Sequence, residues 1–330
     1  SEENKYGFPA TAEGAVTREG TPRMIHDDTY TDRYEYYEAL FDPLWTGAQT
    51  HLRNTKNSGH APRRSRGQIL AELTDDMADL DLGFHTTYRP SRYEEGWLLS
   101  SLRGFIDEGL ISDVLSLVKG GKEASVYCCQ AHPATGLGLL AAKVYRPRMF
   151  RNLRNDKMYR QGREVLTADG RPAGKQAGTI ARAIRNKTAF GRIAQHTSWL
   201  MHEYTALDRL YEAGGAVPRP VSSSSNAVLM SYHGDAHAAA PTLNTIRLER
   251  NEAGHLFRQV LENIDLMLGL DLVHGDLSAY NILYWDGEMT IIDLPQVVNL
   301  RANPKARTIL QRDIERTCQY FALQGVELSL

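Results

Sequence analysis

The stretch LVHGDLSAYNILYWDGEMTIID, residues 272–293, carries the clearest structural pattern in the chain. The pair Asp286-Gly287 lies between two apolar runs, and an Asp-Gly pair in that setting indicates a two-residue β-hairpin turn. Such a hairpin folds Asp293 back beside Asn281. We expect these two side chains to share a divalent cation, because Mg2+ takes a few protein oxygens together with substrate phosphate oxygens. Asp276 would then face the phosphoryl group that is transferred.

Each of these polar residues has an ordinary alternative explanation, because Asp and Asn are common in turns and at strand ends. The joint pattern is more specific. His274, Asp276 and Asn281 follow the spacing H-x-D-x-x-x-x-N, and an Ile-Ile-Asp sequence ending at Asp293 follows the predicted hairpin. This arrangement resembles the catalytic loop and the metal-binding aspartate of protein kinases.

A lysine on a predicted strand completes the phosphate-binding pattern. A strand-like run at residues 114–118 is followed by a glycine-rich turn and by a second strand that ends in LAAKVY, residues 140–145. Phosphoryl transfer depends on positioning and charge neutralisation, so we expect Lys143, flanked by apolar residues, to contact nucleotide phosphates. Glu203 lies beside the buried stripe of a helix predicted over about residues 197–213, and it is the expected ion-pair partner of that lysine. The alternative is an ordinary exposed glutamate.

The turn between the two strands, KGGKEAS at residues 119–125, contains two adjacent glycines. Gly120 and Gly121 would allow backbone N–H groups to approach phosphates closely. The turn lacks the full G-x-G-x-x-G spacing, and adjacent glycines also mark ordinary hairpins. By itself this turn is therefore a weak indicator.

Composition narrows the remaining function classes. The chain has 330 residues, 42% of them hydrophobic, which is enough for one large or two smaller packed units. A net charge of -2 and a pI near 6.6 argue against a uniformly basic nucleic-acid binder. Three cysteines, two of them adjacent, fit neither a disulfide framework nor a zinc site. No apolar run reaches the roughly 20 residues that cross a bilayer, so we expect a cytoplasmic protein without membrane contact.

Charge is nevertheless clustered locally. Residues 143–192 contain 14 Lys and Arg against three acidic residues, a local excess of 11. Such an excess attracts polyanions, which predicts contact with RNA, the ribosome or an acidic partner, with a solvated loop as the alternative. Residues 1–90 are polar and carry no sustained hydrophobic period, so we expect most of them to form a disordered tail.

Four motifs together resemble those of the RIO family of atypical serine/threonine kinases. Residues 121–127, GKEASVY, resemble the phosphate loop of that family, and residues 142–145, AKVY, resemble its lysine strand. Residues 274–281, HGDLSAYN, resemble its catalytic loop, and residues 291–298, IIDLPQVV, resemble its metal loop. The last two motifs are highly specific. The IIDLPQVV form, together with NKTAFG at residues 186–191, is most similar to bacterial RIO-type proteins.

The resemblance implies a set of ligands and residue roles. The ligands are ATP and Mg2+, with Mn2+ as an alternative metal. Asp276, Asp293 and Lys143 would be the catalytic residues, and Asn281 and Asp293 would bind the metal. Some members form an aspartyl-phosphate, a role that would fall on Asp293. Met230 and Tyr232 would bind adenine through backbone contacts. The full set of implied nucleotide-binding residues is Lys119, Gly120, Gly121, Lys122, Ser125, Val126, Lys143, Glu203, Met230 and Tyr232.

The same resemblance implies an α+β, bilobal protein-kinase-like fold. Residues 1–90 would be the mostly disordered tail. Residues 91–232 would form a small β-rich lobe with the phosphate loop, the lysine strand, the basic insertion and one main helix. Residues 233–330 would form a mainly helical lobe with the catalytic and metal loops. The phosphoryl acceptor would be another protein or the chain itself.

The chain departs from the family pattern at two places, and two other functions fit parts of its sequence. Ala279 stands where the family usually has an acidic residue or a proline, and the separation of Lys143 from Glu203 is longer than the family normally requires. A small-molecule kinase of the aminoglycoside or choline type also uses a His-Gly-Asp loop, although such proteins usually carry a larger helical region after it. The other alternative is an RNA-docking scaffold that depends on bound nucleotide.

Overall fold

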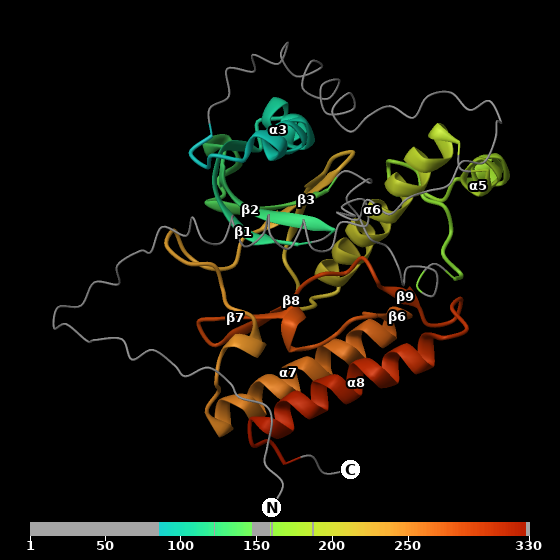
Figure 1. Cartoon of the computed structure of the whole chain (residues 1–330). Coiled ribbons are helices and arrows are strands. Elements are labelled where there is room, and N and C mark those ends of the chain that lie inside the picture. The colour runs from blue at the N-terminus through green and yellow to red at the C-terminus, as the bar shows by residue number, and fades with distance from the viewer. Residues whose placement is uncertain (1–85, 122, 147–158, 160, 187, 328–330) are drawn as a thin grey trace, which may run out of the picture. The chain divides into compact units, whose positions relative to one another are not determined.

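The computed structural model describes residues 86–121, 123–146, 159, 161–186 and 188–327 (Figure 1). Most of the predicted tail, Lys122 of the glycine turn, and a central part of the basic insertion therefore lie outside the described residues.

The first part of the fold is a five-stranded antiparallel sheet in the order β1-β2-β3-β5-β4. Adjacent glycines end β1 and allow the tight connection to β2, and β3 pairs with β5 across the sheet. This arrangement places the lysine strand β3 in the centre of the sheet. The strands are β1 Ile111–Gly120, β2 Ala124–Ala131, β3 Leu139–Tyr145, β4 Pro220–Ser223 and β5 Ala227–Ser231.

Helix α3, Arg92–Asp107, covers one face of this sheet (Figure 1). Ser91 and Glu94 form a capping box at its start, and Gly109 with φ of 65° follows its end. Leu98 and Leu102 recur at helical spacing and are buried against sheet residues. This packing holds α3 against the sheet.

Helix α6, Ala189–Glu212, packs on the other face of the sheet and is preceded by the shorter α5, Ala177–Arg185. The predicted helix at 197–213 is present, but it begins eight residues earlier because Thr188 caps it and accepts a hydrogen bond from Gly191 N at 2.9 Å. Leu200 and Leu207 are buried in the core that α6 shares with the second lobe.

The second lobe is built on two long helices, α7 Arg250–Gly269 and α8 Ala306–Leu323, which lie alongside one another (Figure 1). The Phe257 and Phe321 rings join them with centroids 5.1 Å apart. Above them lie two antiparallel strand pairs, and single-turn 3-10 helices occur at connections. The strands are β6 Leu272–Val273, β7 Ile282–Trp285, β8 Glu288–Ile291 and β9 Val298–Asn299, and the 3-10 helices of this lobe are Leu243–Thr245 and Ala279–Asn281. In the first lobe, 3-10 helices occur at Pro133–Thr135, between β2 and β3, and at Gly174–Gln176, before α5.

Within the part of the chain that the structure describes, none of the helices combines the length and the apolar character that crossing a membrane would require.

Candidate active site

The predicted hairpin is present and brings the two ends of the decisive stretch together. β7 pairs with β8 from Ile282 opposite Ile291 to Trp285 opposite Glu288. Asp286 and Gly287 take φ values of 51° and 84°, as a two-residue turn of this hand requires. Beyond the last strand pair, Ile292 N donates to the carbonyl oxygen of residue 281 at 2.9 Å. The backbones that carry Asn281 and Asp293 are therefore neighbours.

The charged side chains of Lys143, Glu203 and Asp293 come from three separate parts of the chain and meet at one point. Its Nζ donates to Glu203 Oε1 of α6 at 2.6 Å and to Asp293 Oδ1, just after β8, at 2.6 Å. The side chains of Glu203 and Lys143 retain 5% and 12% of their exposure, whereas Asp293 retains 44%. The ion pair predicted between Lys143 and Glu203 is thus present despite the long sequence separation. The contact between Lys143 and Asp293 was not predicted.

Burial and charge act in opposite directions on these groups. Burial lowers the pKa of Lys143, but the carboxylates of Asp293 and Glu203 outweigh it and the net pKa is raised. Burial, helped by the charge of Asp293, raises the pKa of Glu203 in spite of the neighbouring Lys143 ammonium. For Asp293 the order is reversed, because the nearby ammonium holds its pKa below the ordinary value in spite of burial. At neutral pH Lys143 is charged and Asp293 is an anion at the open side of the cluster.

The catalytic-loop motif places Asp276 beside Asn281. Asn281 Nδ2 donates to the backbone oxygen of Asp276 at 2.9 Å and to its Oδ2 at 3.2 Å. The other carboxylate oxygen accepts a hydrogen bond from Arg316 Nη1 of α8 at 2.8 Å. Asn281 is buried, so its amide is held in one orientation. The predicted Asp276 and Asn281 therefore form one hydrogen-bonded unit.

A neutral histidine ties this loop to the strand that precedes Asp293. His274 is buried, and burial lowers the pKa of its imidazole. Its Nε2 donates to the carbonyl oxygen of Ile292 at 3.1 Å, and Asp276 N donates to its Nδ1 at 3.2 Å. The neutral ring satisfies both bonds, so His274 links the backbone of Asp276 to that of Ile292.

Helix α8 holds the loop from the opposite side. The buried Asp313 accepts a hydrogen bond from Gly275 N at 2.8 Å, and Arg312 donates to the carbonyl oxygen of Gly275. Gly275 has φ of 87°, and a Cβ there would lie 2.2 Å from the carbonyl oxygen of Gln296. Only glycine fits this position.

Sequence reasoning missed Asp313, Arg312 and Arg316. One signal was available, since Asp313 occupies the buried stripe of α8 between Ile309 and Thr317, where an apolar residue is usual. A charged residue in that position indicates a buried partner, but its identity needed the tertiary structure.

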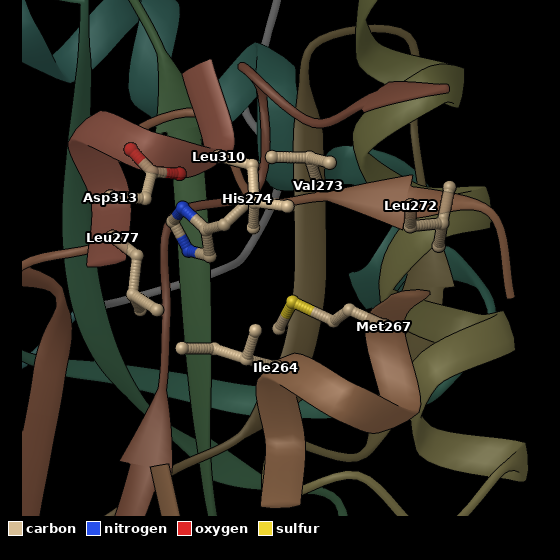
Figure 2. Close-up of a pocket in the computed structure, with 8 residues that line it drawn as sticks. All are labelled: Ile264, Met267, Leu272, Val273, His274, Leu277, Leu310 and Asp313. Carbon is tan, nitrogen blue, oxygen red and sulfur yellow. The ribbon is translucent and has the colours of Figure 1, made fainter. Parts of the chain in front are cut away.

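A pocket lies behind the catalytic loop (Figure 2). Figure 2 shows His274 and Asp313 at one end and the Met267 side chain at the other. None of Lys143, Asp276, Asn281 and Asp293 lines this pocket. The pocket therefore belongs to the packing beneath the loop and not to the candidate site. The lining residues are Ile264, Met267, Leu272, Val273, His274, Leu277, Leu310 and Asp313.

The register of the strands places the predicted nucleotide-binding residues on two different faces of the sheet. Val126 lies opposite Lys143, and Met230 lies opposite Ala141, two residues before that lysine. Opposed residues point to the same face and residues two apart share a face, so Val126, Lys143 and Met230 point the same way. Ser125 does not, because it lies opposite Val144 and is buried with the α3 face. The Ser125 side chain therefore points away from the Lys143 face, so any contact of this residue with the phosphates would involve its backbone, and its place near them stays a prediction.

The remaining predicted residues lie at the edges of the Lys143 face. Lys119 is exposed, and its charge helps to lower the pKa of Asp293. A Cβ on Gly121 would lie 2.6 Å from the carbonyl oxygen of Ala124, so the turn needs a glycine there. Tyr232 follows β5, where burial raises the pKa of its hydroxyl to about 12. Gly120 lies at the end of β1, opposite Ser125.

A family model described as RIO domain matches residues 140–330, more than half of the chain. The chain belongs to the RIO family. The resemblance to RIO-type kinases read from the four motifs is confirmed, and it favours a protein-kinase relationship over the small-molecule kinases.

Curated relatives of the chain are RIO-type serine/threonine-protein kinases. Rio1 of Haloferax volcanii is 29% identical over 224 residues, which cover 67% of this chain and 68% of the relative. RIO1 of Chaetomium thermophilum is 28% identical over 233 residues, which cover 67% of this chain and 42% of the relative. Rio1 of Thermoplasma acidophilum is 33% identical over 129 residues, 39% of this chain and 66% of the relative. These relatives are archaeal and fungal, so the finer similarity to bacterial proteins stays a prediction.

Solved structures agree on the fold. The Rio2 kinase-ADP/Mg2+-phosphoaspartate complex from Chaetomium thermophilum aligns with a TM-score of 0.50 at 18% identity, covering 81% of this chain and 73% of that one. At this identity the likeness shows the fold alone. The predicted α+β, bilobal kinase-like architecture is confirmed.

Proposed function

We propose that this RIO protein binds Mg-ATP against the Lys143 face of the sheet and transfers the terminal phosphoryl group, as a serine/threonine kinase, an ATPase or both. One observation carries the proposal: Lys143 of β3 meets Glu203 of α6 and Asp293 of the metal loop, each at 2.6 Å. A kinase requires this combination of a lysine held by a helix glutamate and a metal-loop aspartate. The names of the curated relatives support the same activity.

The donor groups fit a magnesium ion. Asp293 offers an ionised, partly exposed carboxylate, and Asn281 directs its Nδ2 to Asp276, which leaves its Oδ1 as a ligand oxygen. The described residues contain no group of three His, Cys, Asp or Glu able to hold a metal alone. Phosphate oxygens would complete the coordination, as Mg2+ in nucleotide sites prefers. The bound metal would neutralise charge on the phosphates.

The remaining site residues take roles around the nucleotide. Lys143 contacts the phosphates, and Glu203 positions the lysine side chain. Asp276 holds the acceptor hydroxyl. Val126 and the backbone of Met230 and Tyr232 contact adenine, since the first two lie on the Lys143 face and the third follows β5. Backbone N–H groups of the turn at 119–125 face the phosphates.

Asp293 is itself a candidate acceptor, because the solved Rio2 complex contains a phosphoaspartate. In this chain a carboxylate oxygen of Asp293 would bond to the terminal phosphorus while the bond from that phosphorus to ADP breaks. Hydrolysis of the acyl phosphate would then return the carboxylate and release phosphate. The chain would act as an ATPase in this mode and as a kinase when a serine hydroxyl is the acceptor.

Multiple-turnover assays of the purified chain test this proposal. We expect ADP release in the presence of magnesium, no release with a chelator, and label from γ-labelled ATP on serine or on an acid-labile carboxyl. Asp276→Asn should keep nucleotide affinity and lose about 100- to 10,000-fold in transfer to serine, because the carboxylate that accepts the hydroxyl proton is gone. A wild-type chain that neither hydrolyses ATP nor transfers phosphate would contradict the proposal.

We further propose that the α5–α6 hairpin docks RNA. Between Asp169 and Glu203 the sequence has no acidic residue. α5 packs closely on α6, since a Cβ on Gly191 would lie 2.1 Å from the carbonyl oxygen of Ala183. The hairpin therefore presents a firm surface that combines cations for phosphates with an aromatic ring for stacking. Its exposed residues include Arg182, Arg185, Phe190 and Ile193, and the exposed Lys175 lies in the 3-10 helix just before α5.

The paired change Arg182→Glu/Arg185→Glu is expected to weaken binding of a uridine 20-mer by about tenfold or more at low salt, because two phosphate contacts are lost. The slope of log affinity against log salt should fall by about 1.4, at about 0.7 for each single-strand phosphate contact. Fluorescence anisotropy across a salt series measures both quantities. Lys305→Glu/Arg307→Glu changes two exposed cations near the start of α8 by the same charge and serves as the control. Equal weakening in the two variants would remove the hairpin from the RNA site.

A further inference from the structure

Arg316 of α8 is hydrogen-bonded to the carboxylate of Asp276, the group that would hold the acceptor hydroxyl in the proposed reaction. Its Nη1 donates to Asp276 Oδ1 at 2.8 Å, while Oδ2 of the same carboxylate accepts from Asn281 Nδ2 at 3.2 Å. Both oxygens of Asp276 are therefore hydrogen-bonded before an acceptor arrives. A hydroxyl that approaches Asp276 must share Oδ1 with Arg316 or displace the guanidinium.

The catalytic loop has no cation of its own on this side. Residues 272–285 contain neither Lys nor Arg, so the charge beside Asp276 comes from Arg316, 40 residues away in the sequence. The side chains of Arg316 and Asp276 retain 44% and 38% of their exposure, so both charged ends can be reached from solvent. In the proposed function Lys143 and Asp293 bind the nucleotide, whereas Arg316 contacts Asp276, the residue that would hold the acceptor hydroxyl.

Two neighbouring arginines use several of their N–H donors in hydrogen bonds within the fold, whereas Arg316 uses fewer. Arg312 bonds to Gly275, Asp313 and Tyr159, and Arg163 bonds to the carbonyl oxygens of Pro295 and Val297. Among the described residues, Arg316 makes one hydrogen bond, to Asp276. A guanidinium carries five N–H donors. Arg316 therefore has donors with which it can bind a second anion.

We propose that Arg316 is the anion subsite for the acceptor, and that the acceptor is a protein segment in which the reacting serine is flanked by Asp or Glu. This inference rests on the proposed kinase function. A flanking carboxylate would pair with the guanidinium in the planar geometry that favours Arg, and the guanidinium would turn from Oδ1 toward it. In the transfer step the serine oxygen bonds to the terminal phosphorus as the bond to ADP breaks, and the hydroxyl proton passes to Asp276.

Acceptors of other charge fit the site less well. A neutral segment offers Arg316 no partner, so the guanidinium stays on Oδ1 and competes with the hydroxyl. A basic segment is repelled. The structure therefore predicts a ranking of acidic over neutral over basic flanks that depends on this one side chain.

Three peptides that differ only in Asp, Asn or Lys beside a single serine test the ranking. We expect the wild-type chain to favour the Asp peptide over the Asn peptide by about tenfold in kcat/KM, the size of one charge-assisted hydrogen-bond pair. Arg316→Ala should bring that ratio close to one, and Arg316→Glu should favour the Lys peptide. Arg307→Ala, an exposed arginine on the same helix, should leave the ratio as in the wild type. An unchanged ratio in Arg316→Ala overturns the proposal.

Peptide binding in the presence of a non-hydrolysable ATP analogue separates this inference from the kinase function itself. Wild-type chain should bind the Asp peptide about tenfold more tightly than the Asn peptide, and Arg316→Ala should bind them equally. Equal binding by the wild type contradicts the subsite. A clear binding preference without any transfer would count against the kinase function and would keep the subsite. Thermal unfolding of each variant shows whether it is folded, and we expect small shifts because Arg316 and Asp276 are partly exposed.

Discussion

Asp293→Ala is expected to lower ATP turnover by about 1,000-fold or more, because charge neutralisation at the transferred phosphoryl group is worth that much in kinases and related enzymes. The substitution removes the proposed metal ligand, the contact with Lys143 and the candidate acceptor for an aspartyl-phosphate. Multiple-turnover ADP release at saturating magnesium measures the loss. Acid-labile label on the protein should disappear as well.

Asp286→Asn is the matched control for that variant. Asp286 lies in the turn of the same hairpin, is exposed, and has φ of 51°, a conformation that Asn tolerates well. It should keep turnover and stability near the wild-type values. If Asp293→Ala turned over ATP as fast as Asp286→Asn, Asp293 would be neither a metal ligand nor an acceptor.

Lys143→Met is expected to reduce turnover strongly and also to destabilise the fold by about 3 kcal/mol at neutral pH, because it leaves the buried Glu203 without its counter-ion. Urea unfolding at pH 7 measures the second effect. Adding Glu203→Gln to Lys143→Met should restore much of the stability and none of the turnover, since the second change removes the uncompensated charge and supplies no ammonium.

The destabilisation should depend on pH in a defined direction. The folded-state pKa of Glu203 is already raised by burial, and loss of Lys143 raises it further. A group whose pKa is higher in the folded state stabilises that state below its unfolded value, about 4.3 for Glu, and this contribution is lost as pH rises through the folded pKa. Lys143→Met should therefore be less destabilised at pH 5 than at pH 8. An equal loss at both values would mean that Glu203 is not the source.

Local chemistry accounts for what could be predicted of the site. Asp286 and Gly287 favour a tight turn whatever surrounds them, so the hairpin that returns Asp293 to Asn281 followed from adjacent residues. The pairing of Lys143 with Glu203 followed from the position of that glutamate beside the buried stripe of the predicted helix. The start of α6 was missed because Thr188 caps a helix whose first turns carry no clear apolar stripe.

Pairing across the sheet decides which face the Ser125 side chain joins. Ser125 lies in the motif that resembles a phosphate loop, yet its side chain faces α3 because the register places it opposite Val144. A shift of one residue in register would turn it to the other face, and nothing in the local sequence states which register the strands adopt.

The sequence by itself determined the family and the hairpin, and it singled out Lys143, Asp276, Asn281 and Asp293 as candidate site residues, because turn propensity and motif spacing are properties of neighbouring residues. Only the tertiary structure decided which side chains from distant parts of the sequence contact these residues. Asp313 and Arg316 come to the catalytic loop from α8 through the packing of that helix beneath it, and contacts between distant segments depend on how whole elements pack.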